Sequence, residues 1–137
     1  MANYKISDVE GIGQKFAVKL SKAGVRSVNA LLESGASKKG RKELSSKTGI
    51  DESMILKWVN QADLYRVKGI GSEYSELLEK AGVDTVKELA TRRSDNLYDK
   101  MVEVNSTKRP LVRQLPGKKS VQNWIDSAKK LSPKVTY

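Results

Sequence analysis

Apolar residues recur along this chain at spacings of three and four, which is the period of an α-helix. After Gly13 such a set shares one helical face, and Gly24 is the residue type that ends a helix in the left-handed conformation. The set is Phe16, Ala17, Leu20 and Ala23, and a second one, Tyr74, Leu77, Leu78 and Ala81, precedes Gly82. No convincing alternation with a period of two is present, so we expect an all-α fold.

Serine and aspartate residues indicate where further helices begin, because their side chains accept hydrogen bonds from the first N–H groups of a helix. The predicted N-caps are Ser27, Ser37, Asp51 and Asp84. The helix after Ser37 is expected to run to Thr48, ahead of Gly49. Two more helices are predicted, one beginning near Ser94 and one over residues 118–131.

The chain contains an internal repeat with an offset of 58 residues. Residues 9–31 match residues 67–89, and the glycine-rich sequence Val-x-Gly-Ile-Gly begins both segments. A second match, at an offset of 66, pairs Trp58 with Trp124 and their apolar neighbours. We therefore expect two related units, residues 1–65 and 66–137. Each is too short to bury much surface alone, so they are expected to pack together as one compact, pseudo-symmetric helical body.

Composition narrows the range of functions. The 137 residues include 26 Lys+Arg against 16 Asp+Glu, for a net charge of +10, and contain neither cysteine nor histidine. Disulfides, thiolate zinc sites and imidazole catalysis are excluded, and an anionic partner is favoured. The acidic residues show no metal-ligand spacing, so we expect no enzyme activity, no metal and no cofactor. Without a long apolar run, the protein is expected to be cytoplasmic, with no membrane partner.

The glycine-rich segments have a physical interpretation. The first glycine lets the chain turn with a positive φ, the isoleucine fills the core, and the second glycine lets a ligand approach the start of a new helix. N–H groups at that start form a site for an anion such as a phosphate, because they lack carbonyl partners and lie at the positive end of the helix dipole.

This pattern resembles the helix-hairpin-helix motif of proteins that bind DNA without sequence specificity, and the chain carries it twice, from Val9 to Leu20 and from Val67 to Leu78. Together with the segments around Ile50, Trp58, Leu89 and Trp124, it is similar to an uncharacterised bacterial family built from tandem helix-hairpin-helix units. The resemblance implies an all-helical tandem fold, close to the SAM and helix-hairpin-helix type, and nucleic-acid binding. It implies no reaction.

The two predicted hairpins differ in charge. Lysines 15, 19 and 22 follow the first, whereas glutamates 73, 76 and 79 follow the second, where repulsion weakens a phosphate contact. The predicted phosphate-binding residues are Gly11, Ile12, Gly13, Gln14 and Lys15 in the first hairpin and, as a weaker or purely structural counterpart, Gly69, Ile70, Gly71 and Ser72. In either hairpin the alternative is a packing or protein-docking role.

A basic cluster follows Ser37. Lys38, Lys39, Arg41 and Lys42 stand at the start of a predicted helix, where the dipole disfavours positive charge, so an external phosphate would explain them; a solvated loop is the alternative. Lys108 and Arg109 begin a further basic stretch around two prolines. Trp58 and Trp124 lie in apolar stripes at equivalent repeat positions, so we assign them to the core rather than to base stacking.

The sequence thus predicts binding to nucleic acid, with DNA favoured and RNA as a second candidate, through hairpin amides and basic side chains that contact phosphates. No helix presents the arginine, asparagine or glutamine residues that base-specific contacts require, so binding is expected to be independent of sequence. The alternative is a protein-interaction or assembly module that docks an acidic partner.

Overall fold

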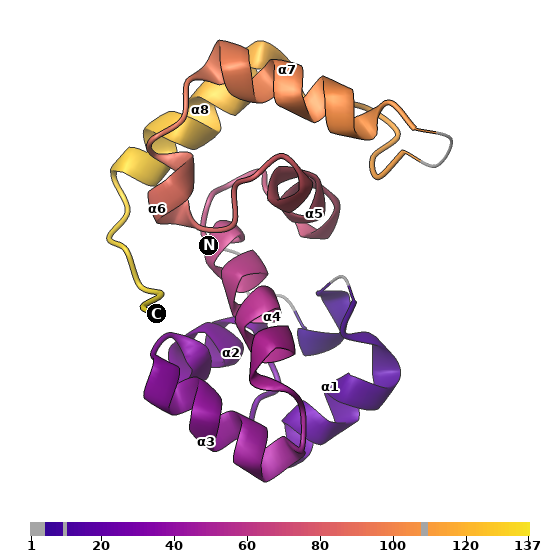
Figure 1. The fold of residues 1–137 in the computed structure, drawn as a ribbon, viewed down its shortest axis with the longest axis vertical. Helices are drawn as coiled ribbons and strands as arrows, with labels where there is room; N and C mark the ends of the chain where they lie inside the picture. The colour runs from indigo at the N-terminus through magenta and orange to yellow at the C-terminus, as the bar shows by residue number, and fades with distance from the viewer. Residues whose placement is uncertain (1–4, 10, 108–109) are drawn as a thin grey trace. The chain divides into compact units, whose positions relative to one another are not determined.

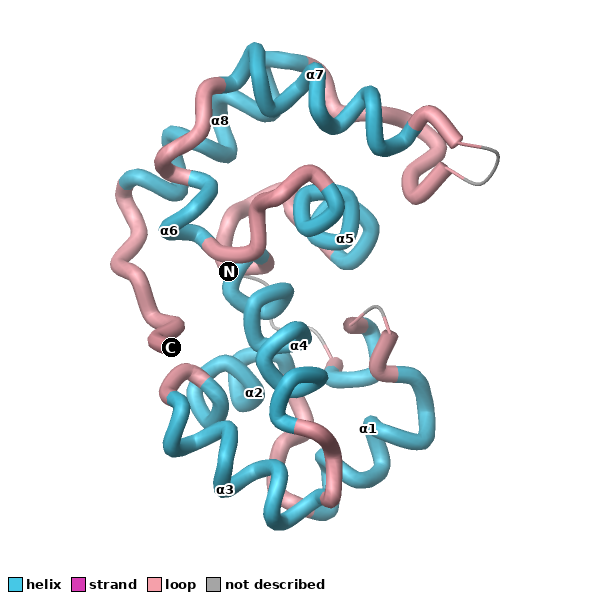
Figure 2. The backbone as a smooth tube through the Cα atoms, in the orientation of Figure 1, coloured by secondary structure: helices cyan, strands magenta, loops and turns pink. Residues whose placement is uncertain are grey.

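A computed structural model describes residues 5–9, 11–107 and 110–137. In these ranges the fold is all-helical, with eight α-helices, one short 3-10 helix and a single isolated β-bridge between Lys5 and Ser27 (Figures 1 and 2). The predicted fold class is confirmed at this level. The pairing of two helix-hairpin-helix units as one pseudo-symmetric body stays a prediction.

The chain forms two compact units. Of the described residues, 5–9 and 11–63 form the first unit together with Lys134–Tyr137, and those within Leu64–Pro133 form the second. The repeat assigns residues 134–137 to the second half, but the structure places them in the first unit. There the backbone N–H of Thr136 donates to the carbonyl of Ala36 at 2.8 Å. A contact between residues 100 positions apart carries no signal in the local pattern of the sequence.

In the first unit, α4 supplies much of the core. Its residues Ile55, Trp58 and Val59 are buried, and in Figure 1 it lies between α1 and α3. The elements of this unit are η1 (Ile6–Asp8), α1 (Gly13–Lys22), α2 (Val28–Gly35), α3 (Lys38–Thr48) and α4 (Glu52–Leu64). The last residue of α4, Leu64, belongs to the core of the second unit.

The second unit is built on one apolar cluster. Leu77, Leu78, Met101 and Trp124 are among its buried members, which come from all four helices of the unit. These helices are α5 (Ser72–Lys80), α6 (Val86–Leu89), α7 (Ser94–Asn105) and α8 (Lys118–Lys129). Helix α8 packs against α6 and α7, and α5 packs against α7.

The helix N-caps agree with the sequence except at one position. Ser27 Oγ accepts a hydrogen bond from Ala30 N at 3.1 Å, and Ser37 Oγ accepts one from Gly40 N at 3.0 Å. Asp84 was the wrong choice for α6, because the N-cap is Thr85, whose hydroxyl accepts from Glu88 N at 3.3 Å. The repeat explains the difference, since Thr85 occupies the position equivalent to Ser27.

Both tryptophans belong to the core. The exposed fraction is 2% for Trp58 and 5% for Trp124, so neither indole ring is free to stack on a base. The sequence assignment of these residues to the apolar interior is confirmed.

Candidate functional site

The two glycine turns share the conformation of their first glycine and one backbone hydrogen bond. Gly11 and Gly69 have φ values of 89° and 96°, in the region that favours glycine. In each turn the isoleucine N–H donates to the valine carbonyl three residues earlier, at 3.2 Å for Ile12 and 3.1 Å for Ile70. The equivalence found in the sequence therefore extends to the backbone of each turn.

The helices that follow these turns also end alike. At the end of α1, Val25 N–H donates to the Leu20 carbonyl at 2.8 Å, and at the end of α5 Val83 N–H donates to the Leu78 carbonyl at the same distance. Each bond closes around a glycine with positive φ, Gly24 or Gly82, in the Schellman arrangement. The carbonyls at the two helix ends are satisfied in the same way.

A tryptophan packs beneath each turn. Trp58 contacts the Phe16 ring and Trp124 contacts the Tyr74 ring, both with centroids 5.3 Å apart. The indole nitrogen also approaches the turn glycine. A Cβ added at Gly11 would lie 3.7 Å from Trp58 Nε1, whereas a Cβ at Gly69 would lie 2.9 Å from Trp124 Nε1. The second turn is therefore the more tightly packed of the two.

The two turns differ where the next helix begins. Gly13 has a φ of 64° and is the first residue of α1, whereas Gly71 is extended, with φ −112°, and precedes α5. Neither N-cap residue, Ile12 or Gly71, contributes a side-chain hydrogen bond. The first N–H groups of an α-helix have no carbonyl partner within the helix, so the start of α1 leaves donors for an external acceptor.

The predicted hairpin residues divide into buried and exposed ones. Ile12 and Ile70 are both 1% exposed, so their side chains fill the core and only their backbone can serve a ligand. The first hairpin exposes Gly11, Gly13, Gln14 and Lys15, whereas in the second Gly69 is exposed and Gly71 and Ser72 are half-buried.

The helices that follow the two turns differ in charge. On α1, Lys15 and Lys22 are exposed, Lys19 Nζ lies 5.9 Å from the centroid of the Phe16 ring, and the first turn contains no acidic residue. On α5, Glu73 stands in the first turn, and Glu76 and Glu79 follow on the same helix. An anion is attracted to the start of α1 and repelled by the first turn of α5.

The acidic surface of the second unit is partly neutralised from within. Arg92 donates through Nη2 to Glu88 Oε1 at 2.8 Å and to the Gly82 carbonyl at 2.9 Å. Partial desolvation raises the pKa of Asp84, and the carboxylates of Glu88 and Glu79 raise it further, while Arg92 opposes the rise. In the first unit, a Cβ placed at the equivalent glycine, Gly24, would meet no atom within 4 Å.

The basic cluster at the start of α3 is only partly available to a ligand. Lys38, Lys39 and Lys42 are exposed, but Arg41 is 4% exposed. Its guanidinium donates to the carbonyls of Gly35 at 2.9 Å, Ala36 at 3.1 Å and Thr136 at 2.7 Å. Arg41 therefore holds residues 134–137 against the α2–α3 junction, and its donors are used within the fold.

The structure does not bring all the predicted site residues together. The first hairpin lies at the start of α1 and the basic cluster at the start of α3, with α4 between these helices in Figure 1. Lys38 lines a pocket that is also lined by the carboxylate of Glu52. The second hairpin belongs to the second unit, and the predicted cations Lys108 and Arg109 lie outside the described residues.

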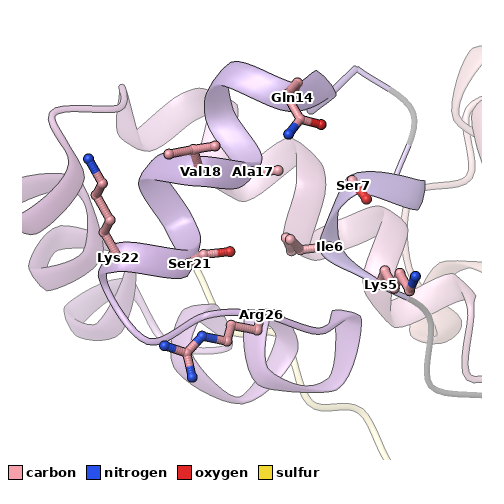
Figure 3. Close-up of a pocket in the computed structure, with 9 residues that line it drawn as sticks. All are labelled: Lys5, Ile6, Ser7, Gln14, Ala17, Val18, Ser21, Lys22 and Arg26. Atoms are coloured by element: carbon pink, nitrogen blue, oxygen red, sulfur yellow. The ribbon is translucent and has the colours of Figure 1, made fainter.

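A pocket of about 440 Å³ opens beside α1 and groups residues that sequence reasoning did not combine. It is lined by Lys5, Ile6, Ser7, Gln14, Ala17, Val18, Ser21, Lys22 and Arg26. Figure 3 shows Ile6, Ala17 and Ser21 around its centre, with Lys5, Lys22 and Arg26 at the rim. A comparison of the two repeats would have drawn attention to Arg26, because the equivalent residue is Asp84.

No group of three or more acidic, histidine or cysteine residues is arranged to hold a metal ion in the described part of the chain. None of the helices formed by residues 5–9, 11–107 and 110–137 has the length and apolar character needed to span a membrane.

Most of the chain matches a known protein family. The family described as "Domain of unknown function (DUF4332)" matches residues 10–131, which is most of the chain. No curated protein and no solved structure matches the chain.

Proposed function

The chain belongs to the DUF4332 family, whose function is unknown, and we propose that it binds nucleic acid, chiefly DNA, without sequence specificity. In this proposal the segments from Val9 to Leu20 and from Val67 to Leu78 are helix-hairpin-helix motifs. The first makes the principal phosphate contact, through the backbone at Gly11–Lys15, and the second is mainly structural.

The start of α1 is the observation that carries the proposal. It combines an N-terminus without a side-chain cap, a glycine with positive φ at position 13 and exposed lysines on the same helix. A phosphate there would accept from backbone donors and gain about 0.3–1 kcal/mol from the helix dipole at an exposed site. Backbone and lysine contacts to phosphate read no base, which is why the binding is independent of sequence.

The α3 cluster supplies a second set of contacts. Lys38, Lys39 and Lys42 are exposed, so they are available to neighbouring phosphates. Arg41 is left out of this set, because its guanidinium donates to three backbone carbonyls of the first unit. Its role in the proposal is to hold the start of α3 in place.

Fluorescence anisotropy of labelled duplex DNA, single-stranded DNA and RNA tests the proposal, at about 50 and about 200 mM salt, where phosphate contacts lose affinity steeply. We expect micromolar binding at the lower salt that weakens with a log–log slope of about −0.9 for each duplex phosphate contacted. Lys15→Glu should weaken binding several-fold, and the Lys15→Glu/Lys39→Glu pair more strongly.

Lys119→Glu is the matched control. Lys119 is an exposed lysine near the start of α8, so the substitution makes the same change in net charge on a helix of the second unit. Equal losses of affinity for Lys15→Glu and Lys119→Glu would show that binding depends on net charge alone and not on the first hairpin. An absence of binding to all three nucleic acids at low salt would refute the proposal and leave docking of an acidic protein as the function.

A further inference from the structure

The pocket beside α1 carries more positive charge than the fold itself explains. Lys5, Lys22 and Arg26 are exposed at its rim, and none of the nine described residues that line it is acidic. The bridge between Lys5 and Ser27, and a hydrogen bond of 3.3 Å from Ile6 N to the Arg26 carbonyl, hold two of these cations on adjacent segments. Like charges around one pocket repel, and an anion placed among them reduces the repulsion.

The rest of the pocket is neutral and mixed in character. Ile6 and Ala17 form an apolar floor, and Val18 beside them is 43% exposed. Among the described residues, Val18 is one of two large apolar side chains that are exposed rather than buried or half-buried. Ser7, Gln14 and Ser21 add hydroxyl and amide groups that can both donate and accept hydrogen bonds. A ligand suited to these walls has an anionic end and a flat, partly apolar body with polar edges.

We propose that this pocket binds one unpaired nucleotide, with its phosphate among the rim cations and its sugar and base over Ile6, Ala17 and Val18. The volume of 440 Å³ lies in the range of small-molecule sites. A base stacked and paired inside a duplex cannot enter such a hollow, so the nucleotide is free or lies in a single strand or at a strand end. The choice of nucleotide chemistry rests on the proposed function, which it deepens by naming the unit that is bound.

The second repeat shows what the same helix surface looks like without this site. Val18, Ser21 and Arg26 correspond to Glu76, Glu79 and Asp84 at the offset of 58, on a backbone that makes the same turn and helix-end hydrogen bonds. The variant Val18→Glu/Ser21→Glu/Arg26→Asp therefore installs residues that this local fold already accommodates. It changes the net charge by −4 without removing a lysine of the first hairpin.

An NMR titration of the full chain with adenosine monophosphate tests the site directly. We expect amide shifts centred on Ser7, Ser21 and Arg26, and tighter binding than for adenosine or inorganic phosphate alone, since each of these fills only part of the pocket. The triple variant should lose at least about tenfold in affinity, because it removes one charged hydrogen-bond donor and adds three carboxylates. Lys119→Glu/Lys129→Glu on α8 makes the same change in net charge and should change the affinity less than twofold.

Strands distinguish the sources of the nucleotide. A 5′-phosphorylated single strand that binds more tightly than the free nucleotide identifies a strand as the occupant, and the reverse order identifies a free nucleotide; both support the site. Shifts located elsewhere, or inorganic phosphate binding as tightly as the nucleotide, would overturn it. If the triple variant keeps full affinity for nucleotide and strand while Lys15→Glu loses strand binding, the pocket proposal fails and the hairpin function stands.

Discussion

The segments that begin at Val9 and Val67 make the same turn and helix-end hydrogen bonds in the two units, yet present different surfaces. In the first unit, lysines on α1 are exposed, and a Cβ at Gly24, the glycine after this helix, would meet open space. In the second unit, Arg92 donates to the carbonyl of Gly82, the equivalent glycine after α5, and pairs with Glu88. The backbone depends on glycines and buried apolar residues, which the repeats share. The exposed charges bear little on that backbone, so they differ freely between the repeats, and our proposal assigns anion binding chiefly to the first unit.

The largest expected effect concerns the packing of the two turns. Gly11→Ala should lower the free energy of unfolding by about 1–2 kcal/mol, the cost of a side chain in a left-handed conformation. Gly69→Ala should cost about 2–4 kcal/mol, because its Cβ would also lie 2.9 Å from Trp124 Nε1 and force the indole to shift. Urea denaturation followed by circular dichroism measures both values. Equal losses would show that the closer indole contact has no energetic weight.

The next effect tests whether charge alone separates the two surfaces. Glu73→Lys/Glu76→Val/Glu79→Ser installs on α5 the residues that α1 carries at positions 15, 18 and 21. If the backbone of the second turn can bind phosphate once these charges are changed, the affinity for single-stranded DNA should rise about tenfold, equivalent to about 1.4 kcal/mol. Anisotropy at low salt provides the measurement.

A control for that graft is Asp99→Lys/Glu103→Lys on α7, which makes the same change in net charge at two exposed positions. An equal gain from this control would mean that the backbone of the second turn contributes nothing to binding. The extended conformation of Gly71, where Gly13 has a positive φ, would then be the feature that separates the turns.

The N-caps of α2 and α6, which are equivalent positions of the two repeats, provide a smaller test. Ser27→Ala and Thr85→Ala each remove a hydroxyl that accepts from a backbone N–H, at 3.1 and 3.3 Å. Each should cost about 1 kcal/mol, the usual value for an N-cap. Thermal denaturation of the two variants measures the cost. If one substitution lowered the melting temperature and the other did not, the two N-caps would not be equivalent.

The smallest effect is the pH dependence of Asp84. Partial desolvation, followed by Glu88 and Glu79, raises its pKa in the folded state, so the native protein holds this proton to higher pH than the unfolded chain. The contribution of Asp84 to stability therefore falls as pH rises from the ordinary aspartate pKa, about 3.9, through the raised value.

Asp84→Asn should remove that fall and make the protein slightly more stable than wild type at pH 7. The gain should vanish in acid, where wild-type Asp84 is protonated in both states. Urea midpoints at pH 3.5, 5 and 7 measure the trend. A variant that is less stable than wild type at pH 7 would show that the ionised carboxylate is stabilising.

Much of the fold was predictable because its signals are local. The helical spacing of apolar residues, the hydroxyl caps at Ser27 and Ser37 and the glycines that end α1 and α5 each act within a few residues. The choice of Asp84 as the N-cap of α6 was wrong because aspartate and threonine both cap helices well. Only alignment with Ser27 in the first repeat distinguishes Thr85 from its neighbour.

The candidate site was less predictable. The hairpin glycines were recognisable from the repeat and Lys15 from its charge, but the burial of Arg41 was not predictable, because its partners include Thr136, 95 residues away. The pocket was missed for the same reason. Lys5 and Arg26 become neighbours only when the segment before η1 pairs with the segment before α2.

The sequence by itself determined that this protein is helical, repeated, rich in positive charge and different in charge between its repeats, since periodicity, identity and charge are properties of residues in order. The tertiary structure decided which cations are exposed. It also decided that the Arg41 guanidinium donates to backbone carbonyls and that Lys5, Lys22 and Arg26 surround a pocket. Exposure and proximity depend on contacts between distant segments, and local patterns do not encode those contacts.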